Sequence, residues 1–118
     1  MSAHIRLISC VTAFLILFFV LCGCISSSIG DVRYAGSGII AQVHNPDEPS
    51  DAFVQVTIYR VTGLTQQEYS VVMAPARLLT GDNTVLIPVI LGPGTYKLKM
   101  YLIQNNERRT AVIRDIVV

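Results

Sequence analysis

The chain has 118 residues, which is room for one domain and little more. Beyond Cys24, eight basic residues are balanced by eight acidic ones, which argues against a nucleic-acid binder because such proteins carry a basic excess. Hydrophobic residues make up 52% of the chain, and their excess is concentrated between Leu7 and Ile25, where no residue is charged.

The N-terminal segment has the three parts of a secretory signal. Arg6 and the amino terminus provide a positive start, Val11 to Leu21 is a strongly apolar run, and small residues follow. The positive end stays in the cytoplasm because basic residues resist translocation. The pattern therefore predicts that the rest of the chain is exported.

The end of this segment carries a specific motif. Leu21-Cys22-Gly23-Cys24 resembles the lipobox of prokaryotic lipoproteins, and the Cys-Ile-Ser-Ser-Ser continuation also resembles archaeal lipoproteins. The resemblance implies that residues 1–23 are a signal peptide cut before Cys24, and that the Cys24 thiol carries a diacylglycerol. The protein would then be lipid-anchored at the extracytoplasmic face of the cell membrane. Cys22 is an unusual residue for its place in the motif.

An uncleaved membrane anchor is the alternative. Leu7 to Ile25 is 19 residues long, and about 20 apolar residues span a bilayer as a helix. The protein would then be a single-pass membrane protein with its domain on the same side. Residues 24–31 are expected to be a short tether, and residues 32–118 a domain without cysteine and hence without disulfides.

After residue 30 the hydrophobic pattern has a period of two, and no helical period with caps occurs. Short alternating runs separated by turn residues are typical of a β-sandwich. Pro88 lacks an N–H group, so its strand is expected to lie at a sheet edge there or to bulge. The predicted strands are residues 32–35, 38–44, 53–61, 68–73, 84–91, 96–103 and 111–118, with a loop over 74–83.

This order of strands resembles immunoglobulin-like cell-surface modules, particularly the fibronectin type III and CARDB families. The resemblance lies in Ile39–Pro46, Val54–Tyr59 and Leu91–Leu98, the last containing Gly94-Thr95-Tyr96. It implies an all-β, Ig-like antiparallel sandwich of about seven strands, preceded by the hydrophobic segment. It also implies that Gly94 and Tyr96 form a structural tyrosine corner, although Tyr96 as a simple core residue is an equal alternative. The chain lacks the Trp and the cysteine pair of many such domains.

An acidic loop is the candidate metal site. Asn45, Asp47, Glu48 and Asp51 offer oxygen ligands within seven residues, and extracellular modules often bind Ca²⁺ weakly through such ligands. The spacing matches no known calcium loop, and the alternative is a solvated turn.

The domain has few residues suited to catalysis. His44 is its only histidine, whereas zinc needs three or four nitrogen or sulfur ligands and a Ser nucleophile needs both a base and an orienting group. We therefore expect no enzyme activity and no cofactor.

These patterns together predict a membrane-tethered module with an adhesive, scaffolding or partner-binding role. The alternatives are an accessory subunit of a membrane complex and a solute- or carbohydrate-binding module. Phe53, Tyr59 and Val61 on the outward side of their strand are the patch expected to meet a protein partner. Arg108 and Arg109 are a candidate contact for anionic lipid headgroups, and the alternatives are a solvated loop or pairing with Asp47 or Asp51.

Overall fold

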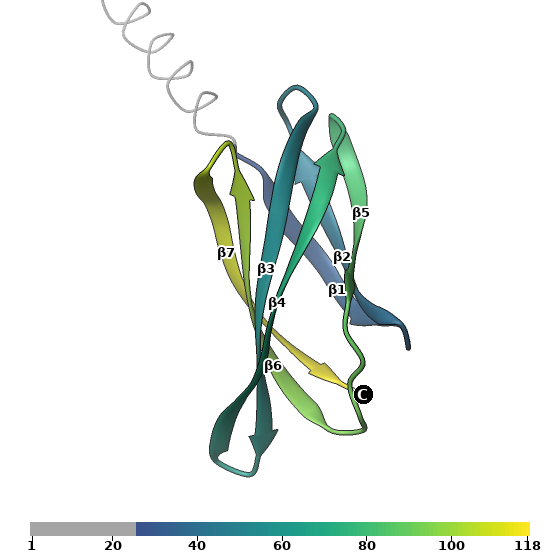
Figure 1. Cartoon of the computed structure of the whole chain (residues 1–118), viewed down its shortest axis with the longest axis vertical. Coiled ribbons are helices and arrows are strands. Elements are labelled where there is room, and N and C mark those ends of the chain that lie inside the picture. The colour runs from purple at the N-terminus through teal and green to yellow at the C-terminus, as the bar shows by residue number, and fades with distance from the viewer. Residues whose placement is uncertain (1–25) are drawn as a thin grey trace, which may run out of the picture.

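Residues 26–118 are described by a computed structural model, and they form seven antiparallel strands in two packed sheets, a β-sandwich (Figure 1). The prediction of an all-β fold of about seven strands is confirmed. The strands are β1 (Ser28–Tyr34), β2 (Gly38–Asn45), β3 (Ser50–Thr62), β4 (Thr65–Leu78), β5 (Gly81–Pro88), β6 (Thr95–Gln104) and β7 (Glu107–Val117). One sheet has the order β1-β2-β5 and the other the order β4-β3-β6-β7.

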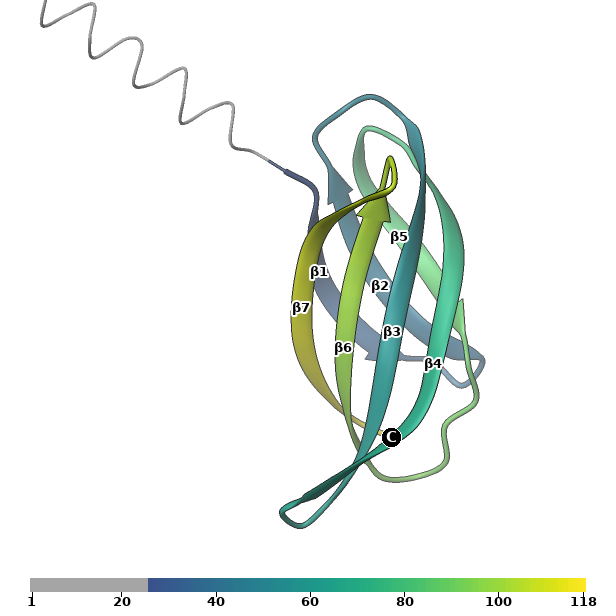
Figure 2. The ribbon, with the colours of Figure 1, turned by 60° about the vertical axis from the view of Figure 1, so that its left-hand side comes forward.

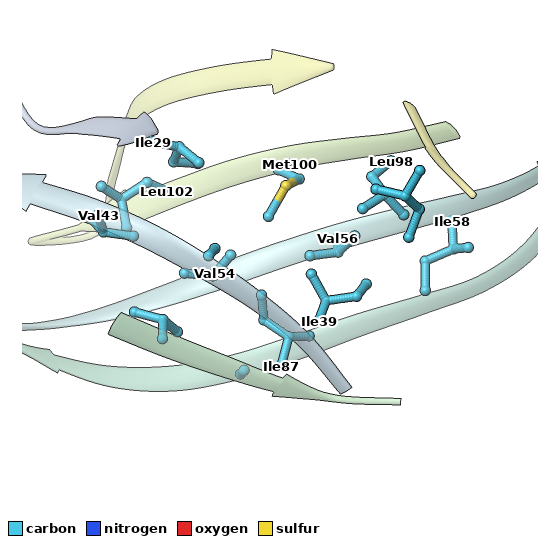
Figure 3. Close-up of a cluster of buried hydrophobic side chains, with 14 of the residues drawn as sticks. Ile29, Ile39, Val43, Val54, Val56, Ile58, Ile87, Leu98, Met100 and Leu102 are labelled. Carbon is cyan, nitrogen blue, oxygen red and sulfur yellow. The ribbon is translucent and has the colours of Figure 1, made fainter. Parts of the chain in front are cut away.

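The core lies between the sheets and is built by side chains at alternate positions of each strand (Figure 3). β3 and β6 are the two central strands of the larger sheet. Every second residue is buried along β6 and from Ala52 to Ile58 of β3, as the alternation predicts. Burying each large aliphatic side chain contributes about 1.5–3 kcal/mol. The fully buried side chains that Figure 3 labels are Ile39, Val43, Val54, Val56, Ile58, Ile87, Leu98, Met100 and Leu102.

The smaller sheet depends on one close backbone approach. Gly38 at the start of β2 pairs with Pro88 at the end of β5. A Cβ atom on Gly38 would lie 2.4 Å from the carbonyl oxygen of Ile87, so only glycine fits. Within the described part of the chain, β5 pairs with β2 alone, so Pro88 lies in an edge strand, as predicted.

The first strand begins earlier than the sequence pattern indicates. The expected tether over residues 24–31 overlaps β1, which starts at Ser28, and Ser27 and Ile29 are already buried. A β-bulge between Ile29 and Val32 interrupts the pairing with β2 and breaks the period of two. The sequence pattern therefore predicted a strand only from residue 32. The hydrophobic segment expected before this strand lies outside the described residues.

The fourth strand is much longer than predicted. The expected loop over residues 74–83 is wrong, because β4 continues to Leu78 and β5 begins at Gly81. Pro75 fits within β4 because, among residues 26–118, β3 is its only sheet partner, and an edge strand tolerates proline. Tyr69 is the extra residue of a second bulge, opposite Ile58 and Tyr59.

The two ends of the sandwich differ. The turns over residues 46–49, 79–80 and 105–106 lie at the end where β1 begins, which we call the tether end (Figure 2). Asn105 and Asn106 both have positive φ, 54° and 61°, as a two-residue type I′ hairpin turn requires. At the opposite end the β3–β4 hairpin extends past its neighbours, with fully exposed Leu64 in its turn (Figure 1).

Candidate functional site

The surface with the clearest functional character is the outward side of the four-stranded sheet, which we call the outer face. Its strands lie side by side in the order β4-β3-β6-β7 (Figure 2). Because strand residues alternate between the two sides of a sheet, the residues that do not enter the core form this face. Strand pairing aligns them in rows: Pro75–Phe53–Ile103–Arg108, Met73–Gln55–Tyr101–Ala111 and Val71–Thr57–Lys99–Ile113.

The outer face exposes large apolar side chains from three strands. Phe53, Val71, Met73 and Ile113 have exposed fractions between 45% and 57%. They lie in adjacent rows, so a partner that covered one of them would reach the others. Apolar surface gathered in this way is typical of an interaction site, whereas single exposed apolar residues are not.

The sequence pattern identified only part of this face. Phe53 is an outward residue of β3, and Tyr59 and Val61 are half-buried on the same strand. Val71, Met73 and Ile113 were not recognised, although each is an apolar residue between two inward-facing neighbours. Their strands are next to β3 or β6 only through pairing over long sequence distances, which alternation within one strand does not reveal.

Three cations lie on the outer face beside aromatic rings or a carboxylate. The guanidinium of Arg108 lies 4.1 Å from the ring centroid of Tyr101, and Lys99 Nζ lies 5.9 Å from that of Tyr59. Lys97 Nζ is 3.9 Å from a carboxylate oxygen of Asp115. Cations over tyrosine faces are held by the ring quadrupole, so Lys99 and Arg108 have preferred positions although neither belongs to an ion pair among residues 26–118.

Two shallow hollows open on this face. One, of about 410 Å³, lies toward the tether end and is lined by Pro49, Ser50, Asp51, Phe53, Ile103, Asn105 and Asn106. The other, of about 380 Å³, is lined by Tyr59, Gln66, Lys97, Lys99 and Ile113. The outer face is therefore not flat.

A buried polar cluster closes the tether end. The Ser27 hydroxyl donates a hydrogen bond to Oε1 of Gln104 over 2.8 Å. The Gln104 amide donates to the Ser50 hydroxyl and, over 3.4 Å, to Oδ1 of Asn45. Buried polar groups are tolerated when each finds a partner, and every buried side-chain polar atom of residues 26–118 has one. The cluster joins the start of β1 to both sheets.

The acidic loop proposed for calcium is arranged as a structural turn. Asn45 is fully buried, its Oδ1 accepts the N–H of Asp47, and its amide donates to the carbonyl of Glu48. Asp51 lies on β3, where it pairs with Arg77 at 3.2 Å. Over residues 26–118 no three side chains of His, Cys, Asp or Glu gather as they would around a metal ion. The structure therefore does not bring the four proposed ligands together.

The remaining predicted residues have local partners. Tyr96 is 1% exposed, and its hydroxyl donates to the carbonyl of Gly92, four residues earlier, over 2.9 Å. Gly94 has φ 155°, and its N–H and carbonyl both bond to Val118. His44 faces Asp82 at 2.9 Å on the exposed side of the smaller sheet. None of these residues adjoins the outer face.

Arg108 and Arg109 do not pair with Asp47 or Asp51. Arg109 lies 3.5 Å from Glu107, and Arg108 stacks on Tyr101. At the tether end, residues 44–51, 77–82 and 104–109 carry five carboxylates against three arginines. This balance is unfavourable for contact with anionic headgroups.

Comparison of the sequence with protein-family models and with curated proteins finds no match. Among residues 26–118 there is no helix with the length and apolarity needed to span a membrane. Cys24, the proposed lipid attachment site, lies outside the described residues.

Proposed function

We propose that this protein is a membrane-tethered extracytoplasmic module whose non-enzymatic role is to bind a protein partner through the outer face. The observation that carries the proposal is the group of large apolar side chains that β4, β3 and β7 expose on one side of the sandwich. A partner that buried Phe53, Val71, Met73 and Ile113 would remove this surface from water. The removal favours binding by about 25 cal/mol of free energy for each Å² of apolar area.

An Ig-like assignment of the sandwich is part of this proposal. In the immunoglobulin constant domain the fourth strand joins the first, second and fifth, whereas here β4 pairs with β3. We therefore favour the fibronectin type III-like form of the resemblance. A Tyr96 hydroxyl bonded to a backbone carbonyl four residues upstream is consistent with the tyrosine corner of such domains.

Anchoring through Cys24 would hold the domain close to the bilayer. Ser27 is already tied to Gln104, and three residues of extended chain span about 10 Å at most. A diacylglycerol supplies the two acyl chains that stable anchoring requires. An uncleaved helix, the alternative anchor, would give a similar distance.

The anchor is tested by the intact mass of the protein extracted from its own membrane. Lipidation predicts a chain that begins at Cys24 and carries the mass of a diacylglycerol, and Cys24→Ala should prevent both cleavage and lipid attachment. A Cys24→Ala protein with the same mass change as wild type would exclude the lipoprotein proposal, and an uncleaved wild-type chain would favour the helical anchor.

The partner-binding role is tested by photo-crosslinking in intact membranes. A photoreactive amino acid at Val71, which is 54% exposed, probes the outer face, and the same group at Leu86, 51% exposed on the other sheet, is the matched control. We expect a discrete protein adduct from position 71 and none from position 86. Equal labelling from both positions, or none from position 71, would contradict the proposal.

The identity of the captured protein shows whether the module is an accessory subunit of a membrane complex or binds another kind of protein. An adduct to an integral membrane protein would identify an accessory subunit, which the short distance that an anchor at Cys24 would leave favours. A carbohydrate-binding role is less well supported. Sugar sites stack on open aromatic faces, whereas Arg108 covers the ring of Tyr101 and Lys99 lies over that of Tyr59.

A further inference from the structure

The outer face holds every lysine of this protein. Lys97 and Lys99 are the only two lysines in the sequence, and both are outward residues of β6. They are two residues apart on one side of a strand, so their Cα atoms are separated by about 7 Å. Both line the same hollow, with Tyr59 and Ile113 as its apolar walls and Gln66 beside them.

The positive charge in this hollow is only partly balanced. Lys97 has a distant, mostly exposed partner in Asp115, at 3.9 Å. Lys99 has no carboxylate within 4.0 Å among residues 26–118, and its cross-strand neighbours are Thr57 and Ile113. Both residues are half-buried, and like charges close together attract a counter-ion. Two such groups side by side therefore favour an anion between them.

The surroundings of the hollow indicate which kind of anion it accepts. Val71 is two strands from Lys99 in the same row, and Ile113 is next to it. Lys97 lies in the next row with Tyr59, its partner Asp115 and, beyond Tyr59, Glu68. An occupant would thus meet the Lys99 ammonium, unpaired within residues 26–118, between Val71 and Ile113 with Lys97 beside it, which fits an acidic side chain among apolar ones. Lys99 lies five residues, about 17 Å along β6, from Gln104. The hollow is therefore separate from the tether end, where carboxylates outnumber arginines.

We propose that the Lys97–Lys99 hollow binds a Glu or Asp carboxylate from an acidic, partly apolar segment of the partner protein. This inference rests on the proposed function and names the chemistry of the contact. The ammonium groups provide charge and hydrogen-bond donors, Gln66 adds a neutral donor, and Tyr59 and Ile113 contact the carbon chain of the acidic residue. The neighbouring Val71 and Met73 receive the apolar side chains of the same segment.

The test uses the full-length protein in its own membrane with two probes. The first is the photoreactive group at Val71. The second is a water-soluble carbodiimide, which joins a lysine amine to a carboxylate in contact as an amide and takes up the water that is lost. Arginine does not react in this way, so Lys97 and Lys99 are the only side-chain amines that can form such links.

The expected result has three parts. Wild-type protein forms a carbodiimide link from Lys99 to a Glu or Asp of the protein that Val71 captures. Lys97→Gln/Lys99→Gln lowers the Val71 photo-adduct at least tenfold. The control Arg33→Gln/Arg60→Gln, which removes two charges from exposed positions outside the outer face, leaves it within twofold of wild type.

A charge-preserving variant distinguishes loss of partner binding from loss of the reactive amine and from loss of folding. Lys99→Arg should retain the Val71 photo-adduct within threefold and lose the carbodiimide link from position 99. A Val71 adduct that persists at wild-type yield in Lys97→Gln/Lys99→Gln would overturn this inference and leave the proposed function standing. No protein adduct at Val71 in wild type would overturn the proposed function itself, and an adduct consisting only of lipid would overturn both.

Discussion

Ser27 and Gln104 are hydrogen-bonded over 2.8 Å although 77 residues separate them in the chain. The bond joins the first residues of the domain to the end of β6, the strand that carries Lys97 and Lys99. The start of β1 is therefore fixed to the four-stranded sheet by buried contacts.

Gln104→Ala should destabilise the domain by about 2 kcal/mol. The substitution leaves the buried Ser27 and Asn45 groups without their Gln104 partner, and an unsatisfied buried polar group costs about 1–3 kcal/mol. Chemical denaturation of the full-length protein in detergent measures the change. Gln67→Ala, at an exposed position of β4, is the control and should stay within about 0.5 kcal/mol of wild type. Equal stability of the two variants would mean that the cluster adds nothing.

Gly38→Ala should destabilise the smaller sheet by about 2 kcal/mol or more. The new methyl group would lie 2.4 Å from the carbonyl oxygen of Ile87, and relieving such overpacking costs about 1–3 kcal/mol. Gly92→Ala is the matched control, because a Cβ atom there has no neighbour within 4 Å. The denaturation midpoints of the two variants should differ clearly. A Gly38→Ala protein as stable as Gly92→Ala would show that β2 and β5 can separate without loss.

Met100→Ala and Met73→Ala should have opposite consequences. Met100 is fully buried between the sheets, and its truncation should cost about 2–5 kcal/mol. Met73 is on the outer face, so its truncation should leave stability within about 0.5 kcal/mol while reducing the Val71 photo-adduct. Denaturation and crosslinking measured on the same samples check both statements. Loss of stability in Met73→Ala would indicate that the outer face serves the fold.

Tyr96→Phe should cost about 1 kcal/mol, the net value of one hydrogen bond inside a protein. The ring would stay buried while the bond to the Gly92 carbonyl is lost. Tyr69→Phe is the control, since the Tyr69 ring is half-exposed and borders Tyr96 edge-on. Thermal unfolding followed by circular dichroism measures both. An unchanged Tyr96→Phe midpoint would favour the simple core residue over the tyrosine corner.

The amino-acid sequence by itself determined the fold class and the sidedness of the central strands. Alternation in β3 and β6 identified the buried Val54, Val56, Leu98 and Met100, and Pro88 identified an edge strand, because these properties depend on neighbours within one strand. The apolar segment over residues 7–25 and the lipobox-like motif at its end, from which the location is proposed, are also read from the sequence alone.

Only the tertiary structure decided which strands are neighbours. That choice places β4 in the four-stranded sheet, brings Val71 and Ile113 into one row with Lys99, and buries Ser27 against Gln104. The physical reason is that strand pairing joins residues far apart in the chain. A period of two assigns each residue to one side of its own strand, but which strands become its neighbours depends on how both sheets pack around the whole core.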